Sequence, residues 1–191
     1  MTRLITCVLG ALAIGGTLVI AGAVGAEPSA PTDRSTQPHL KAWSNIIRDS
    51  SKRFVVLPDF DNAAVLDRET GLVWEQAPDF AVRAWSSPTP PFGLAADACT
   101  SKSIGSRTGW RLPSIHELMS VVDRTLGGLS LPPGHPFTNV QGVLYWSATT
   151  VAANPAFAWV VDFNGGGATP NVKSTAYRVW CVRGGQGVDS Q

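Results

Sequence analysis

His116 and Glu117 are the adjacent pair in this chain that comes nearest to a metal-binding motif. In a zinc protease helix, a second histidine must follow four residues after the first, so that two imidazoles can hold the ion. Position 120 is occupied by Ser120 instead. The pair therefore does not predict a metal site, and we expect the chain to use no metal and no other cofactor.

A helix start accounts for Glu117. Ser114 precedes it by three residues, and this spacing is typical of a capping box, in which serine and glutamate each accept a hydrogen bond from the other's backbone N–H. Apolar residues then recur at helical spacing from Ile115 through Leu118. We predict a short amphipathic helix that begins after Ser114 and ends near Asp123.

Cys99 and Cys181 could form a disulfide or act as reactive thiols. The chain has three cysteines, and the third, Cys7, lies in an apolar N-terminal segment. In an oxidising compartment an isolated pair is most simply a disulfide. We predict that bridge, with a catalytic or reactive thiol as the competing interpretation.

Residues 1–26 have the pattern of a secretory signal peptide. Arg3 supplies the positive start, residues 4–24 form the apolar segment, and Val24-Gly25-Ala26 is a small-residue cleavage site. An uncleaved anchor is the alternative, because the apolar run reaches the length of about 20 residues that a spanning helix needs. Glycines within the run favour cleavage. We therefore expect a secreted or periplasmic protein of the bacterial envelope, with membrane contact only before cleavage.

The predicted mature chain is long enough for one domain with a sizeable core. Removing residues 1–26 leaves 165 residues (191 minus 26). It also leaves 14 Lys and Arg (15 minus Arg3) against 14 Asp and Glu. Because the formal net charge is then zero, the composition gives no electrostatic support for a nucleic-acid partner, and we expect none.

The mature chain divides into a leader, a helix and a main domain. Residues 27–38 are rich in Pro, Ser and Thr and predict a flexible leader. Residues 39–52 predict an N-terminal helix, with Leu40 and Trp43 on one face. Residues 53–187 form the predicted main domain.

Within the main domain, the pattern predicts one hairpin, two helices and three later strands. The hairpin has its turn at residues 67–71, where Gly71 can adopt the positive φ of a bulged turn. The first main helix is predicted over residues 92–103, ahead of the capped one. The closing strands are predicted over residues 143–149, 157–163 and 177–182.

Five short motifs in a fixed order carry a resemblance to one bacterial domain family. They are Asp67-Arg68-Glu69-Thr70-Gly71-Leu72-Val73-Trp74, Ala95-Ala96-Asp97-Ala98-Cys99, Gly109-Trp110-Arg111-Leu112-Pro113, Tyr145-Trp146-Ser147-Ala148-Thr149 and Trp180-Cys181-Val182-Arg183-Gly184. The chain resembles the DUF1566 family, also called the Lcl C-terminal domain family after a collagen-like adhesin, over residues 54–185.

The resemblance implies a fold, a bridge and a class of ligand. The implied fold is α+β and C-type-lectin-like, with two main helices, a small twisted antiparallel sheet and long loops, related to the formylglycine-generating enzyme fold. Cys99 would lie on a helix and Cys181 on the last strand, as a disulfide requires. Trp110 and Arg111 would join the capping pair as a structural motif. In the adhesin, the domain contributes to glycosaminoglycan binding.

Tryptophan is abundant enough to suggest carbohydrate binding. An exposed indole stacks on the apolar face of a sugar ring, and the chain has seven tryptophans. Core packing is favoured for those inside family motifs, which are Trp74, Trp110, Trp146 and Trp180. Trp85 and Trp159 stay open. The Glu-Pro-Asn and Gln-Pro-Asp runs by which lectins hold calcium are absent, so calcium-dependent sugar binding in that manner is not expected.

The loops are the expected place for binding. Residues 79–92 and 126–139 form long loops rigidified by Pro, with a hairpin turn at residues 164–167 expected beside them. Their unassigned aromatic and polar residues are the candidate ligand-binding set, Trp85, His135, Asn139 and Asn164.

The sequence predicts an exported, non-catalytic binding module. Gly-x-Ser-x-Gly and P-loop patterns are absent in usable context, so no enzymatic activity is expected. The expected partner is a glycan or an envelope protein. The alternatives are a structural or protein-interaction module and, third, an enzyme of formylglycine-generating architecture. An exposed aromatic with polar neighbours in the long loops would favour glycan, whereas a flat apolar patch would favour protein.

Overall fold

A computed structural model describes residues 47–86 and 94–185, which all belong to the compact unit Lys41–Gln191. The predicted signal peptide, leader and most of the N-terminal helix over residues 39–52 lie outside the described residues and stay predictions. In the described part of the chain, no helix is long and apolar enough to cross a bilayer.

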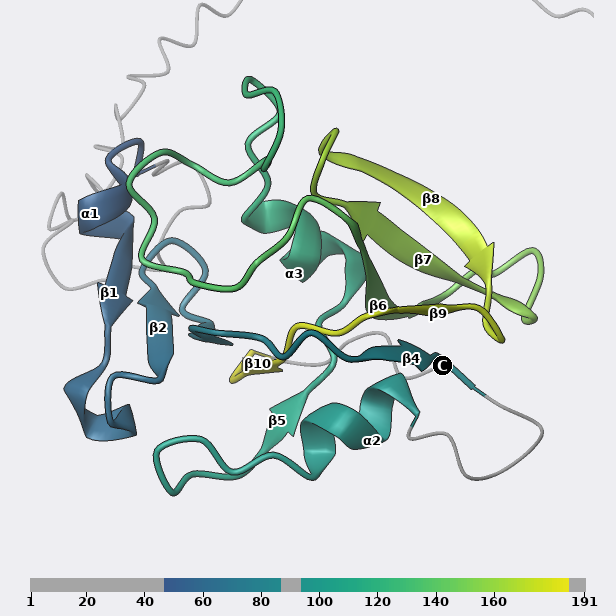
Figure 1. The fold of residues 1–191 in the computed structure, drawn as a ribbon, viewed down its shortest axis with the longest axis horizontal. Helices are drawn as coiled ribbons and strands as arrows, with labels where there is room; N and C mark the ends of the chain where they lie inside the picture. The colour runs from purple at the N-terminus through teal and green to yellow at the C-terminus, as the bar shows by residue number, and fades with distance from the viewer. Residues whose placement is uncertain (1–46, 87–93, 186–191) are drawn as a thin grey trace, which may run out of the picture. The chain divides into compact units, whose positions relative to one another are not determined.

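The described residues fold mainly as β-structure, with ten strands and three short α-helices (Figure 1). In chain order the elements are α1 (Ser50–Arg53), β1 (Phe54–Val56), a 3₁₀ turn η1 (Pro58–Phe60), β2 (Ala64–Asp67), β3 (Val73–Glu75), β4 (Val82–Ala84), α2 (Ala95–Thr100), β5 (Trp110–Arg111), α3 (Ile115–Ser120), β6 (Leu144–Thr150), β7 (Phe157–Asp162), β8 (Gly167–Val172), β9 (Ala176–Arg178) and β10 (Val182–Arg183).

The strands form two five-stranded sheets. One has the order β1-β2-β3-β10-β5, and the other has the order β4-β9-β6-β7-β8. Neighbouring strands are antiparallel, except that β6 and β9 run parallel. The chain passes from one sheet to the other between β9 and β10, so the short segment 179–181 connects the two sheets covalently.

The predicted C-type-lectin-like arrangement with two main helices is wrong. The two helices do exist, but α2 and α3 are six residues each, and the two sheets dominate the fold. The helix predicted over residues 92–103 is described from residue 94, and α2 ends at Thr100, where the Ser101 N–H donates to the carbonyls of Asp97 and Cys99. Helix α3 ends at Ser120, well before Asp123, whose backbone N–H is bonded to the Ser130 carbonyl.

The strand predictions missed both edge strands of the second sheet, β4 and β8, and they missed the change of sheet between β9 and β10. The predicted last strand over residues 177–182 is two strands, β9 and β10, in different sheets. Strand β8 contains Pro170, which removes a backbone donor and is tolerated at an edge, where β8 lies. Strand β4 is the opposite edge of the same sheet and has three residues, in a stretch predicted as loop.

Two local predictions are confirmed. Strands β2 and β3 form the antiparallel hairpin, and Gly71 in its turn has φ +75°. At the start of α3, the Ser114 hydroxyl accepts a hydrogen bond from the Glu117 N–H, and the Glu117 carboxylate accepts one from the Ser114 N–H. Both features could be identified from local spacing in the sequence.

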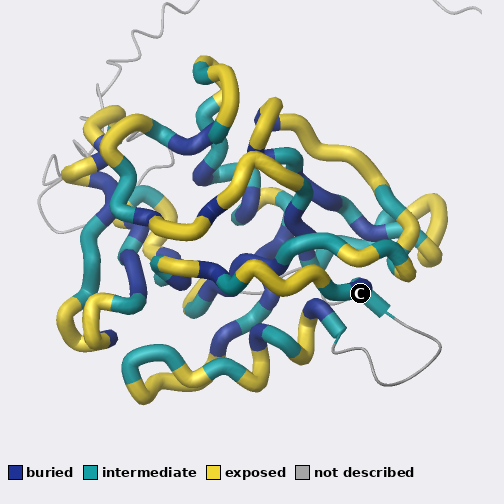
Figure 2. Tube along the Cα trace, viewed as in Figure 1, coloured by how far each residue is buried: buried dark blue, intermediate teal, exposed yellow. Residues whose placement is uncertain are grey.

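The buried residues lie along the inner parts of the chain (Figure 2), and they include most of the aromatic core residues. Trp180 is central, with its ring centroid 4.9 Å from that of Trp74, 4.8 Å from Phe137 and 5.7 Å from Phe163. Trp110 and Trp146 are buried in a second cluster that also contains both cysteines. The prediction that the four motif tryptophans are core residues, Trp74, Trp110, Trp146 and Trp180, is confirmed.

The predicted disulfide between Cys99 and Cys181 is present. It joins α2 to the residue just before β10, and both cysteines are fully buried. Because it closes a loop with a sequence separation of 82 residues, it restricts the unfolded chain strongly. The bridge also leaves neither cysteine as a free thiol.

Replacing both cysteines with alanine should lower the free energy of unfolding by up to about 4 to 5 kcal/mol, the chain-entropy limit for a loop of this length. Denaturant melts of the oxidised protein and of Cys99→Ala/Cys181→Ala measure the loss. Reductant should destabilise only the protein that has the bridge. Two free thiols in the intact mass of the alkylated, unreduced protein would contradict the pairing.

Candidate functional site

The motif residues Arg111 and Glu117 form an internal structural contact. The Arg111 guanidinium donates from Nη1 to Glu117 Oε2 at 2.7 Å and from Nη2 to Oε1 at 2.6 Å, and it also donates to the Gly184 carbonyl. Burial acts to raise the pKa of Glu117, but the hydrogen bonds from Arg111 and Ser114 outweigh it and lower that pKa. The contact ties β5 and α3 to the chain after β10.

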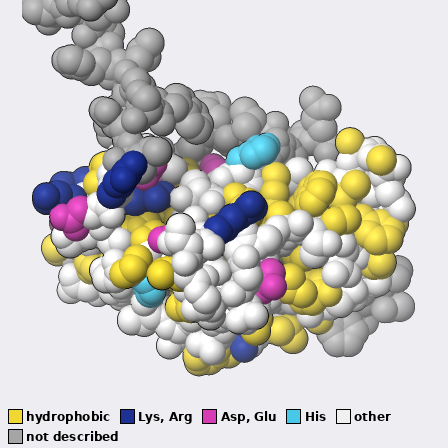
Figure 3. Space-filling view, turned by 90° about the horizontal axis from the view of Figure 1, so that it is seen from above, with side chains coloured by type: hydrophobic (Ala, Val, Ile, Leu, Met, Phe, Trp, Pro, Cys, Tyr) yellow, Lys and Arg dark blue, Asp and Glu magenta, His cyan; other side chains and the backbone are white. Residues whose placement is uncertain are grey.

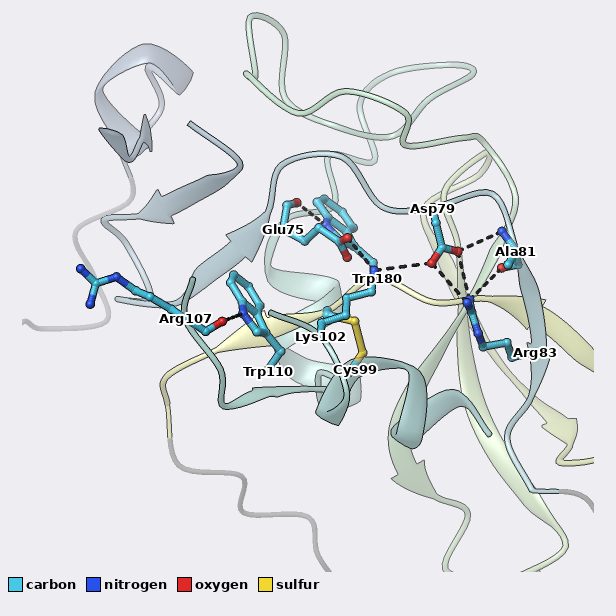
Figure 4. Close-up of polar contacts among 10 residues, drawn as sticks. Glu75, Asp79, Ala81, Arg83, Cys99, Lys102, Arg107, Trp110 and Trp180 are labelled. Atoms are coloured by element: carbon cyan, nitrogen blue, oxygen red, sulfur yellow. Dashed lines mark hydrogen bonds and ion pairs between the residues drawn. A yellow bond between two sulfur atoms is a disulfide. The ribbon is translucent and has the colours of Figure 1, made fainter. Parts of the chain in front are cut away.

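A second polar network fixes the segment that leads into β4 (Figure 4). Lys102 Nζ lies 2.5 Å from Glu75 Oε1 and 3.6 Å from Asp79 Oδ2. Asp79 in turn accepts from Arg83 Nη1 at 3.0 Å, four residues along the chain. Burial raises the pKa of Glu75, although the Lys102 ammonium opposes the shift. This network holds residues 79–83 in place beside β9.

An open pocket of about 480 Å³ lies at the end of the second sheet that this segment borders. Its walls come from β4, β9, the start of β6, and the end of β7 with the turn after it. The lining residues are Val82, Gly142, Val143, Leu144, Asp162, Asn164, Ala176, Tyr177 and Arg178. Val82 and Arg178 are direct partners in the β4–β9 ladder, so the sheet register itself places the valine beside the arginine.

Arg178 differs from the other partly buried arginines. Arg53 and Arg83 bond to carboxylates, Arg111 bonds to a carboxylate and to carbonyls, and Arg183 bonds to the Thr108 carbonyl. Arg178 Nη1, by contrast, is enclosed and has no hydrogen-bond partner among the described residues. Its guanidinium carbon lies 5.0 Å from the centre of the Phe80 ring. The pocket wall therefore contains a cation with one guanidinium nitrogen, Nη1, that is covered by protein and forms no hydrogen bond among the described residues.

Exposed apolar side chains surround this cation. Phe80 is 55% exposed, Val82 is 56% exposed and Val143 is 40% exposed. Together with Val172 on β8, these are the large hydrophobic residues that the described surface exposes. We call Phe80, Val82, Val143 and Arg178 the pocket rim. Apolar groups that stay in water beside an unpaired arginine are typical of a recognition surface.

Two of the predicted ligand residues lie at or near this pocket. Asn164 is exposed and lines it, and its backbone N–H donates to Asp162 Oδ1 at 2.9 Å. A Cβ added to Gly142 would lie 3.5 Å from the Asn164 Cα, an ordinary van der Waals distance, so the two residues are neighbours in the pocket wall. Asn139, exposed and with φ +60°, is three residues before Gly142. The two asparagines thus belong to neighbouring loops, and their ligand role stays a prediction.

The other two predicted residues lie elsewhere, and only Trp85 has its polar atom hydrogen-bonded, because His135 Nδ1 is enclosed without a hydrogen-bond partner among the described residues. Trp85 donates from Nε1 to the Ser147 carbonyl at 2.8 Å, and Lys173 Nζ lies 3.8 Å from the centre of its ring. His135 stacks on Phe137, with 5.8 Å between ring centroids, and burial lowers its pKa. Neither lines the pocket. The four predicted residues therefore do not form one site, although each remains untested as a ligand contact.

Sequence reasoning missed the pocket rim. Phe80 and Val82 stand in a stretch predicted as loop, and Arg178 stands in a predicted strand without a predicted neighbour. Only the β4–β9 pairing brings them together, and a pairing across 96 positions (178 minus 82) has no local signal. The spacing of Phe80 and Val82, two positions apart, was the one available sequence hint of a short strand.

A comparison with family models identifies the family of the chain. The model of the Lcl C-terminal domain family matches residues 63–183, which is 121 of the 191 residues. The chain belongs to this family, as its motifs predicted. No curated protein matched the chain. Among the described residues, no three His, Cys, Asp or Glu side chains come together in a way that could hold a metal ion.

The pKa of Glu117 gives the motif contact a testable pH dependence. A carboxylate whose folded pKa is lowered stabilises the fold above its ordinary value of 4.5, and that contribution is lost as the pH falls through the folded pKa. Glu117→Gln should therefore be less stable than the parent by about 1 to 2 kcal/mol near neutral pH, and the gap should close in acid. Urea melts from pH 7 to pH 3 measure this, and a gap independent of pH would contradict it.

Proposed function

We propose that the chain is an exported, non-catalytic binding module that recognises a protein partner at the pocket rim. The observation that carries this proposal is the combination of exposed Phe80 and Val82 with the unpaired guanidinium of Arg178. Aromatic residues and arginine are enriched where proteins bind one another, and they supply much of the binding energy there.

The rim is held in position before any partner arrives. The network of Lys102, Glu75, Asp79 and Arg83 fixes the approach to β4, and the β4–β9 ladder fixes Val82 against Arg178. Because little side-chain ordering remains to be done on binding, less free energy is lost to entropy. Such preorganisation supports recognition by this surface.

A glycan partner receives less support from the same region. Trp85, the indole predicted to stack on a sugar, uses its N–H internally and has a lysine over its ring. Among the pocket residues, the polar groups suited to sugar hydroxyls are chiefly Asp162 and Asn164, on one wall. Hydrophobic side chains also gather over one part of the face seen in Figure 3, away from most of the charged ones.

One further feature, the buried disulfide, supports both export and a non-catalytic role. The buried Cys99–Cys181 bridge is compatible with an extracellular or periplasmic location. It also uses both cysteines of the predicted mature chain, so neither is available for thiol chemistry of the formylglycine-generating kind. We therefore favour binding over catalysis.

Capture from envelope extract by the chain from Glu27 onward tests the proposal. Phe80→Ser/Val82→Ser should reduce capture of a specific protein at least about tenfold, because it removes the apolar anchors. Val172→Ser, which changes an equally apolar exposed residue on β8, is the matched control and should capture normally. The captured protein is then identified and purified. It is titrated against the parent chain, the double variant and Val172→Ser.

Two outcomes would contradict the proposal. One is equal capture by the parent, the double variant and the control. The other is a glycan-array signal that persists in the double variant while no protein binds in a rim-dependent manner, which would make the module a glycan binder with its site elsewhere.

A further inference from the structure

We propose that the partner presents a C-terminal carboxylate to Arg178, from a polypeptide whose last residue has an apolar side chain. This inference rests on the proposed function and specifies what the pocket rim recognises. It follows from three properties of the pocket, namely its unpaired donors, its apolar neighbours and its size.

The unused donors of Arg178 call for an anion. Burying Nη1 without a partner costs free energy in the unbound protein. Because Nη1 is covered, a carboxylate reaches it only when the guanidinium turns into the pocket, where its planar pair of donors would form charge-assisted, bidentate hydrogen bonds. The nearest acid in the lining, Asp162, does not neutralise the guanidinium, because no ion pair joins them and Asp162 Oδ1 accepts from the Asn164 N–H. Asp79, the acid on the approach to β4, is already paired with Arg83 and Lys102.

The apolar neighbours select among carboxylates. In a C-terminal residue, the α-carboxylate and the side chain are bonded to the same carbon atom. A carboxylate that reaches Arg178 would therefore bring this side chain against Val82 and Val143. A sugar carboxylate would instead bring hydroxyl groups to those valines and leave them without polar partners. The rim therefore fits a carboxylate with an apolar group beside it.

The dimensions fit one chain end. A pocket of about 480 Å³ lies in the range of roughly 300 to 1,000 Å³ that is typical of small-ligand clefts. Its openness to solvent allows the rest of a polypeptide to leave across the surface. Capture of a terminal carboxylate is a known mode of peptide recognition, and here a side-chain guanidinium would provide the donors.

A pair of small probes tests the inference directly. N-acetyl-leucine and N-acetyl-leucinamide differ only in the carboxylate, and each is titrated into the isotopically labelled chain from Glu27 onward while amide shifts are followed by NMR. We expect the acid to bind in the millimolar range, with shifts at Val82, Val143 and Arg178, and the amide to bind about tenfold more weakly.

Variants then assign the preference to one side chain. Arg178→Gln and Arg178→Lys should both lose most of the discrimination between acid and amide, because neither offers the planar pair of donors. Arg107→Gln is the matched control, since Arg107 also lies 5.0 Å from a phenylalanine ring, that of Phe60, on a different part of the chain. The control should keep the preference, and dispersed spectra of each variant confirm that it is folded.

The outcomes separate this inference from the proposed function. Equal binding of acid and amide, or a preference that survives Arg178→Gln, would contradict the proposed recognition of a carboxylate. Either result would leave the proposal of a protein partner at the pocket rim unaffected. Tighter binding of glucuronate than of N-acetyl-leucine would overturn it in favour of an acidic sugar. Loss of capture in Phe80→Ser/Val82→Ser tests the proposed function independently of either probe.

Discussion

The structure depends on one short buried crossing, where the chain leaves the second sheet after β9 and enters the first sheet as β10. The Cys99–Cys181 disulfide fixes this crossing to α2, and two hydrogen bonds fix it to Glu75, whose N–H donates to the Cys181 carbonyl and whose carbonyl accepts from Trp180 Nε1. Because Arg178 is the last residue before the crossing, the position of its guanidinium depends on the same constraint. The core and the candidate site are thus held by one set of contacts.

The sequence could predict the features that depend on local contacts, and it could not predict those that depend on contacts between distant strands. The capping pair Ser114 and Glu117 and the β2–β3 hairpin are local, so spacing alone identified them. The cysteine pair and the buried tryptophans followed from composition and family motifs. The fold class did not, because short helices and two sheets arise from pairings between distant strands. Edge strand β8, with Pro170, and edge strand β4 have almost no local strand signal.

The candidate site could not be predicted from the sequence either, because it forms only when the distant strands β4 and β9 pair. Trp85, His135, Asn139 and Asn164 were chosen as polar or aromatic residues in loops, and only the two asparagines lie at or near the pocket. The site is distinguished by Arg178, whose Nη1 has no hydrogen-bond partner among the described residues. Other buried and partly buried arginines, such as Arg53 and Arg183, do form hydrogen bonds. A missing contact becomes visible only when all the neighbours of a side chain are known. The family assignment identifies the domain without identifying its ligand, and the pocket rim supplies the chemical argument for one.

The central claim is that the pocket rim contacts a protein partner in the intact envelope. Site-specific photocrosslinking in cells that export the chain tests it most directly, with Val143→p-benzoylphenylalanine as the probe and Val172→p-benzoylphenylalanine as the control at a position of equal exposure. The account predicts a discrete crosslinked product at position 143 that is absent at position 172. Crosslinking at position 172 alone, or the same products at both positions, would contradict it.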